Sequence, residues 1–343
     1  MDQPTLVSFC VSTYKRPEIL REQLKRILKQ DYKHFEIIVS DNDPDASAKE
    51  IVNTINDPRA KYFHNPENLG MVKSFNKSLE RSAGDYIVMV TDDDPVYEYM
   101  LSTLLSLKEN YPNYGVYAGC GDWIVQTEQA AGSLKESVGI RSNILKAFPQ
   151  GEVMVFNADE AANAYLTGVL SKSFLLWSCC IVRRDIALKV GGMPDYGSEF
   201  LTDHAYMIVT TSINGLVFIN KPMGGQEVRG DNFGFDFDRL KEKYLATPSL
   251  FYNFLKQHLN KKNNWPVISK AIKDFTGRAW VEYSLIIFQN QKMKGANTQE
   301  FMGIMRKAFS QNGLTKWKYK FYLKAYNKNL FKLLLRIKRM IYK

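Results

Sequence analysis

The sequence has 343 residues, enough for one large or two ordinary domains, and its hydrophobic fraction of 45% is that of a normal globular core. A disordered chain is therefore excluded. The formal charge of +10 belongs to one end of the chain, because ten Lys or Arg and no Asp or Glu lie between residues 316 and 343. The preceding residues carry 36 basic and 36 acidic side chains, so that part is formally neutral.

The lengths of the apolar runs and the pattern of cysteines indicate in which cellular compartment the protein is expected. The sequence has no uninterrupted run of about 18 apolar residues, so we expect no membrane-spanning helix. It enters a strand almost at once, so we expect no secretory leader. The four cysteines follow no zinc or disulfide pattern, and we expect them to be buried thiols of a cytoplasmic protein.

Strands and helices alternate through the first third of the chain. We expect strands at residues 6–12, 35–40, 61–64 and 86–91, with helices that begin at Pro17, near Ala46 and at Gly70. The first helix shows apolar residues at helical spacing, and Pro17 suits its first position. This order predicts an α/β fold with a mostly parallel sheet flanked by helices.

After the first third, the chain continues with further strands and helices and then becomes entirely helical by pattern. We expect a helix at 97–110, a strand at 116–125, an irregular insert at 127–156, a further strand at 179–182 and a helix from Thr202. Beyond about residue 237 only helical segments follow. The predicted units are therefore an α/β domain at 1–235, a helical extension at 236–315 and a basic amphipathic helix at 316–343.

Three consecutive acids, Asp92, Asp93 and Asp94, follow the apolar strand directly. Ligands of parallel sheets bind beyond the carboxyl ends of the strands, so these carboxylates are expected where a ligand would lie. Adjacent carboxylates repel, and a hard divalent cation with phosphate oxygens as further ligands would neutralise them. The alternative is that one acid caps a helix that begins near Pro95 while the others are solvated.

Four elements of the sequence, in order, resemble family 2 glycosyltransferases of the GT-A fold. They are the segment Val11–Pro17, the strand that ends in Asp41 and Asn42, the segment Asn68–Gly70, and the acids after Gly84 and Asp85. The resemblance covers roughly residues 5–235 and is to inverting enzymes of bacterial surface-polysaccharide synthesis. Two departures are a threonine, Thr91, in place of the family's first acid, and Thr202 in place of a glutamate.

The resemblance implies roles for the acids. Asp93 and Asp94 would bind a divalent metal, Mn²⁺ or Mg²⁺, and Asp92 would contact the ribose or the diphosphate. Asp203 would accept the proton of the attacking hydroxyl, a step that inverts the anomeric carbon without a covalent enzyme intermediate. As an alternative, Asp203 is the N-cap of its helix.

Further residues are predicted to contact the donor. Thr13 and Tyr14 begin the loop after the first strand, and Asn68 belongs to the third matching element. Asp41 would accept a hydrogen bond from a nucleobase, which the resemblance implies is uracil, unless it forms an Asx turn with Asn42 and Asp43. Lys73 would reach a phosphate, although a solvated lysine is an equal alternative.

The basic tail at 316–343 interleaves its charges with aromatic and aliphatic residues. That composition fits a helix at an anionic membrane surface, on the inner face of the cell membrane, with a lipid-linked saccharide as acceptor. The alternatives are a helix docked on the domain or a nucleic-acid arm, and we expect no nucleic-acid partner.

The sequence thus predicts a metal-dependent glycosyltransferase that moves a sugar from a nucleotide diphosphate, UDP in the first instance, to a saccharide hydroxyl. A nucleotidyltransferase is disfavoured because residues 11–17 contain no glycine to hold a triphosphate. A membrane-associated scaffold that binds sugar nucleotides without catalysis is the remaining alternative.

Overall fold

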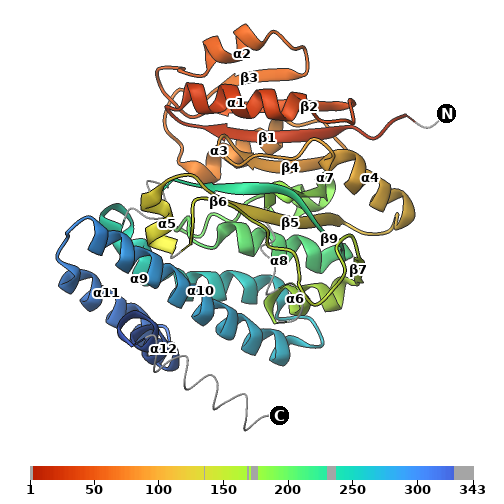
Figure 1. Ribbon diagram of the computed structural model, residues 1–343. Coiled ribbons are helices and arrows are strands. Elements are labelled where there is room, and N and C mark those ends of the chain that lie inside the picture. Colours follow the sequence, from red (N-terminus) through yellow and green to blue (C-terminus); the bar gives the residue numbers. More distant parts are fainter. Residues whose placement is uncertain (1–2, 135, 168–169, 171–176, 230–236, 328–343) are drawn as a thin grey trace.

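The computed structural model describes residues 3–134, 136–167, 170, 177–229 and 237–327. One nine-stranded sheet forms the centre, in the order β3-β2-β1-β4-β8-β5-β9-β7, with β6 paired to β5 (Figure 1). The strands are β1 Val7–Thr13, β2 Phe35–Asp41, β3 Ala60–His64, β4 Tyr86–Thr91, β5 Val116–Val125, β6 Gly139–Arg141, β7 Val153–Phe156, β8 Cys180–Arg183 and β9 Leu216–Val228.

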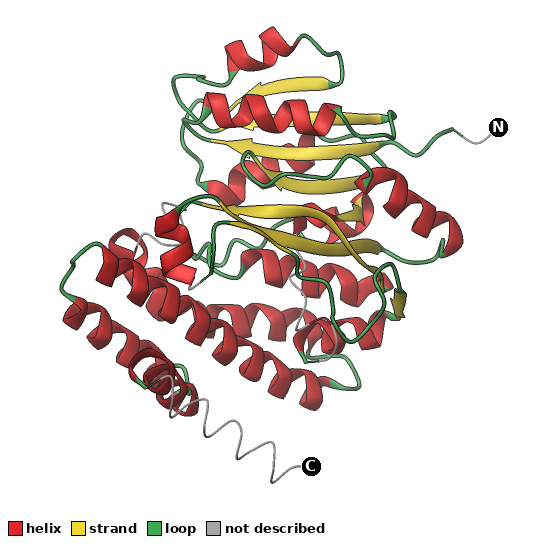
Figure 2. Ribbon diagram, in the orientation of Figure 1, coloured by secondary structure: helices red, strands yellow, loops and turns green. Residues whose placement is uncertain are grey.

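Helices cover the sheet and continue beyond it (Figure 2). Those that alternate with the strands are α1 Pro17–Leu28, α2 Lys49–Ile55, α3 Met71–Arg81, α4 Met100–Asn110, α5 Glu128–Leu134, α6 Ala158–Leu166, α7 Arg184–Lys189 and α8 Thr202–Asn214. The C-terminal helices are α9 Phe237–Leu259, α10 Trp265–Met293, α11 Thr298–Gln311 and α12 Thr315–Tyr326.

The predicted mostly parallel α/β sheet is confirmed. Strands β3, β2, β1 and β4 are parallel, and β5 is parallel to β9, whereas β8 runs antiparallel to both β4 and β5. In register, Thr13 lies opposite Asp41, and Ser12 lies opposite Thr91. The carboxyl ends of β1, β2 and β4 therefore meet at one edge of the sheet.

Two segments differ from the prediction because they pair with the sheet. The helix expected from residue 97 begins at Met100, since the chain before it bonds to β9: the Tyr97 amide donates to the Met223 carbonyl, and the Gly225 amide to the Pro95 carbonyl, each at 2.9 Å. The insert at 127–156 is not irregular throughout, because it contains α5, β6 and β7.

The hydrophobic core is continuous through the predicted boundaries at 235 and 315. It extends from β1 to α12, and the C-terminal helices contribute some of its largest fully buried side chains. In Figure 1, α9 and α10 lie beside α8 and α6. The helical extension is thus packed directly on the α/β unit. The predicted division at residues 235 and 315 follows changes in the sequence pattern, and the core continues across both positions.

Helix α12, the described part of the basic tail, docks on α10. Phe321 is fully buried, and the Trp317 indole lies against Gly277, where an added Cβ would be 2.2 Å from Nε1. Lys316 pairs with Asp274 at 2.6 Å. The docked-helix alternative therefore holds for α12, while residues 328–343 lie outside the described part of the chain. Each described helix is too short or too polar to cross a bilayer.

Because Phe321 lies in the core, Phe321→Ala should lower the free energy of unfolding by about 3–5 kcal/mol. The matched control is Tyr319→Ala on the same helix, where the side chain is 62% exposed and the expected change is within about 0.5 kcal/mol. Urea unfolding measures both. Equal small effects would show that α12 does not contribute to the core.

Candidate functional site

The candidate site begins with Asp92, the first acid after β4. Thr13 at the end of β1 donates its hydroxyl to Asp92 Oδ2 at 2.7 Å, and the Asp92 side chain is fully buried. Burial raises the pKa of Asp92 to about 7 against the opposing charge of Arg16, and the charge of Asp93 adds to the increase. Two predicted site residues, Thr13 and Asp92, are thus in direct contact.

Arg16 binds the first two acids together. Its Nε donates to Asp92 Oδ2 at 3.2 Å, its Nη1 to Asp93 Oδ2 at 2.8 Å, and its Nη2 pairs with Asp92 Oδ1. Lys15 has a positive φ of 55°, which reverses the chain after β1, and Pro17 then begins α1. The loop therefore brings Arg16 over the end of β4.

The sequence prediction assigned no role to Arg16. A signal was present, because Arg16 occupies the N-cap position of α1, where residues with a side-chain acceptor are preferred. An arginine there offers donors only, so its side chain is available for an acceptor elsewhere.

Asp94 does not join this cluster. The Asp94 amide donates to Thr91 Oγ1 at 3.1 Å and closes a turn, and Asp94 Oδ1 accepts from the Glu227 amide of β9 at 3.2 Å. Gln23 of α1 supports the turn by donating to the Thr91 and Asp94 carbonyls at 3.0 and 2.6 Å. Burial raises the pKa of Asp94, and the charge of Asp93 adds to this. Asp94 Oδ1 is thus engaged with β9, and the assignment of Asp94 as a metal ligand stays a prediction.

Asp41 forms the Asx turn that was the alternative to nucleobase binding. Its Oδ1 accepts from the Asp43 amide at 3.0 Å, and its Oδ2 accepts from the Ala48 amide and the Tyr62 hydroxyl, each at 3.0 Å. The carboxylate is fully buried. Asp41 lies at the expected edge, but its oxygens stabilise the turn after β2.

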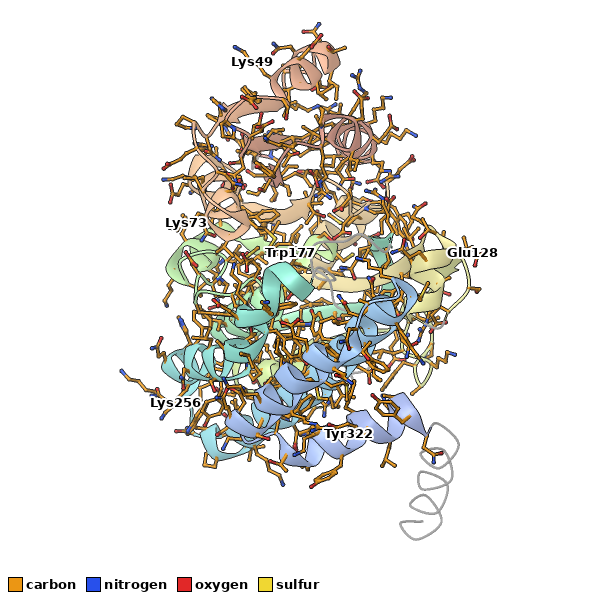
Figure 3. All side chains as sticks on the ribbon, turned by 90° about the vertical axis from the view of Figure 1, so that its left-hand side faces the viewer. Lys49, Lys73, Glu128, Trp177, Lys256 and Tyr322 are labelled. Atoms are coloured by element: carbon orange, nitrogen blue, oxygen red, sulfur yellow. The ribbon has the colours of Figure 1, made fainter. Side chains whose placement is uncertain are left out.

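The remaining predicted donor contacts lie around the same edge. Asn68 accepts from the Asn42 side chain at 2.7 Å and from the Gly70 amide at 2.9 Å, so it shapes the loop before α3. Tyr14 is 39% exposed at the end of β1. Lys73 is exposed on α3, where Figure 3 labels it.

Asp203 is in the first turn of α8. The N-cap position is Leu201, which has a positive φ of 63° and makes no side-chain cap. Asp203 Oδ1 accepts from the adjacent His204 amide at 2.8 Å. Burial raises the pKa of Tyr165 and of Tyr196, and in both the charge of Asp203 adds to the increase. The carboxylate therefore lies among phenol groups and does not act as the N-cap.

The segment before α8 is held by the C-terminal helices. The Phe200 ring packs edge-on against Trp280 and Tyr283 of α10, with centroids 5.7 and 5.6 Å away. Glu199 pairs with Lys243 of α9, and the Ser198 and Thr247 hydroxyls are 2.6 Å apart. The extension thereby fixes the position of Leu201 and the start of α8.

The segment that precedes α8 is also attached to α3, near residue 193. Asn76 accepts from the Met193 amide at 2.7 Å and donates to the Met193 carbonyl at 2.9 Å. Gly192 has a φ of +74°, and a Cβ there would be 2.3 Å from Asn76 Oδ1. Gly192 is therefore favoured both by this contact and by its left-handed backbone, whereas Gly191 is favoured by its backbone alone, with a φ of +80°.

A divalent metal such as Mg²⁺ or Ca²⁺ takes several oxygen ligands. Within the described ranges, no group of three or more His, Cys, Asp and Glu side chains converges to hold a metal ion. Asp93 is 13% exposed and presents its carboxylate at the surface, next to buried Asp92. These residues fit an ion that keeps most of its ligand positions for phosphate and water, as Mg²⁺ does, and not an all-protein cage.

The protein is thus an α/β protein whose acids Asp92 and Asp93 lie beyond the carboxyl end of a parallel strand, where such sheets bind their ligands. The model of one family, "Glycosyl transferase family 2", matches residues 8–186. The chain belongs to glycosyl transferase family 2.

Three curated relatives illustrate the match. The putative colanic acid biosynthesis glycosyl transferase WcaA of Escherichia coli strain K12 is 30% identical over 37% of this chain and 46% of its own length. The GalNAc(5)-diNAcBac-PP-undecaprenol beta-1,3-glucosyltransferase of Campylobacter jejuni is 33% identical over 33% and 38%. The abequosyltransferase RfbV of Salmonella typhimurium is 26% identical over 75% and 78%. The chain spans half or less of the first two relatives.

Among solved structures, S. aureus TarS 1–349 in complex with UDP-GlcNAc matches with a TM-score of 0.53 and 13% identity, over 94% of this chain and 93% of that one. The complex of the same protein with UDP gives a TM-score of 0.52 and 15% identity. At this identity the likeness shows the fold, and the predicted GT-A architecture with a C-terminal helical region is confirmed.

Proposed function

We propose that this protein is an inverting, metal-dependent glycosyltransferase that moves a sugar from a nucleotide diphosphate donor, with UDP as the nucleotide, to a saccharide hydroxyl. The observation that carries the proposal is the pair of carboxylates, Asp92 and Asp93, held at the carboxyl ends of parallel strands with a cation across them. Family membership and the TarS complexes with UDP and UDP-GlcNAc support the choice of donor.

In the proposed mechanism, the donor lies across the ends of β1, β2 and β4. Tyr14 offers an exposed ring to the base, and Lys73 offers a charge to the phosphates. Asp41 and Asn68 shape the surrounding loops. Asp92 orients the ribose side of the nucleotide from its contact with Thr13.

Asp93 would hold the divalent ion, which when bound neutralises the charge that develops on the leaving diphosphate. Asp94, the other predicted ligand, closes the turn at residues 91–94 and accepts from the Glu227 amide of β9. Asp203 accepts the proton of the acceptor hydroxyl as that oxygen attacks the anomeric carbon. Attack opposite the leaving group inverts the configuration in one displacement.

The acceptor is proposed to be a lipid-linked saccharide of surface-polysaccharide assembly, reached from the cytoplasmic face of a membrane. The names of the Campylobacter and Escherichia relatives, which include undecaprenol and colanic acid, support this class of acceptor. The basic tail would supply the attraction to anionic lipid, at about 1 kcal/mol for each charge near the surface.

UDP binding should require a divalent cation, because the diphosphate and the carboxylates repel each other without one. Calorimetric titration of UDP with Mn²⁺ should show saturable binding, and excess chelator should abolish it. UDP binding of equal affinity in chelator would remove the metal role of Asp93.

Asp203→Asn should lower turnover by about 100-fold or more while UDP affinity is retained, because the amide cannot accept the proton. Donor and acceptor consumption are followed together, so that donor hydrolysis is separated from transfer. The control is Asp185→Asn, an exposed pair with Arg183 at the start of α7, which should retain turnover. Near-normal turnover of Asp203→Asn would leave the base unassigned.

A chain that ends at Asn327 keeps α12 and loses six of the ten basic residues of the tail. It should bind UDP like the full chain but sediment far less with vesicles that contain anionic lipid. Neutral vesicles are the control, and added salt should weaken binding of the full chain. Equal sedimentation of both chains would contradict a membrane role for residues 328–343.

A further inference from the structure

We infer that Arg16 exchanges partners when the donor binds: it holds Asp92 and Asp93 in the free protein, and it moves to the diphosphate when a divalent ion takes its place at Asp93. The inference rests on the proposed function and adds a residue, with a role at two stages, to that site. In the free protein, Arg16 is then the cation that neutralises Asp92 and Asp93 at the end of β4.

The contacts show that Arg16 occupies the position of a cation. One guanidinium meets oxygens of both carboxylates, two of its contacts being 2.8 and 3.2 Å long. The Asp92 side chain is fully buried, so a counter-charge at this place lowers the cost of its ionised form. A metal ion at Asp93 would compete for the same oxygen and would repel the guanidinium.

The three side chains differ in their freedom to change partners. Arg16 is 42% exposed, so its head group has a path to solvent and to a ligand at the sheet edge. Asp92 retains the Thr13 hydroxyl at 2.7 Å if Arg16 leaves. The Arg16 backbone is anchored to α1, because its carbonyl accepts from the Leu20 amide at 3.0 Å. The proposed exchange of partners therefore involves rotation of the Arg16 side chain and no movement of the backbone.

The destination of Arg16 follows from the chemistry of the guanidinium. It remains charged at all relevant pH values and presents a planar set of donors that matches phosphate oxygens in pairs. A diphosphate bound to an ion at Asp93 would bring such oxygens beside Arg16. The exchange therefore couples the two ligands: the ion by itself must displace Arg16, whereas the ion with a diphosphate gives Arg16 a new partner.

The test measures binding without turnover, using Mn²⁺ alone and then UDP in saturating Mn²⁺. Arg16→Gln removes the charge and keeps a side-chain donor. It should bind Mn²⁺ alone about tenfold more tightly than the native protein, because no cation has to leave, and UDP about tenfold more weakly; each factor corresponds to about 1.4 kcal/mol. Mn²⁺ binding is read by electron paramagnetic resonance, and UDP binding by calorimetry.

The matched control is Arg21→Gln, on the same helix, where the arginine pairs with Glu18 at 3.0 Å on the surface. Both affinities should equal those of the native protein. Arg16→Lys keeps the charge but not the paired donors, so it should bind Mn²⁺ alone like the native protein and UDP more weakly. This variant decides the question if Arg16→Gln does not fold.

The outcomes separate this inference from the proposed function. Native-like Mn²⁺ affinity in Arg16→Gln, or a weaker one, would overturn the competition, and unchanged UDP affinity would overturn the transfer to the diphosphate. In both cases native binding of UDP with Mn²⁺ leaves the glycosyltransferase proposal in place. A native protein that binds neither Mn²⁺ nor UDP overturns both.

Discussion

The buried negative charge at the end of β4 is the constraint on which the site depends. Asp92 is fully enclosed, and an unpaired carboxylate there would cost far more than a typical protein can tolerate. The structure provides the Thr13 hydroxyl from β1 and the Arg16 guanidinium from the following loop. The loop geometry, with Lys15 in the left-handed region and Pro17 starting α1, serves to place that one cation.

The turn at residues 91–94, which follows β4, connects that strand to α1 and to β9. Thr91 closes it by accepting from the Asp94 amide, Gln23 of α1 binds its carbonyls, and Asp94 accepts from the Glu227 amide of β9. Consecutive acids therefore have different tasks: Asp92 and Asp93 face the cation, and Asp94 braces the sheet. Thr91, which stands in place of the family's first acid, takes part in this turn through its hydroxyl.

The helical extension has a comparable role at the proposed base. Asp203 is the second residue of α8, two positions after Leu201, whose positive φ is a costly conformation for a residue other than glycine. Trp280 and Tyr283 of α10 confine the preceding Phe200, and Lys243 of α9 holds Glu199. The C-terminal helices thus help to fix the start of α8, where the proposed base lies, and α12 packs on α10 through Phe321 and Trp317.

The sequence by itself determined the first strands and their mostly parallel sheet, the edge at which Thr13, Asp41 and Asp92 gather, and the helix that carries Asp203, because apolar periodicity and strand-end acids are local signals. Only the tertiary structure decided which oxygens are available. Asp41 and Asp94 have the same side chain and a similar strand-end position as Asp92, but amides from Ala48 and Glu227 occupy them. The N-cap position of Arg16 is a local signal, but its two carboxylate partners and the burial of α12 depend on contacts between segments far apart in the chain.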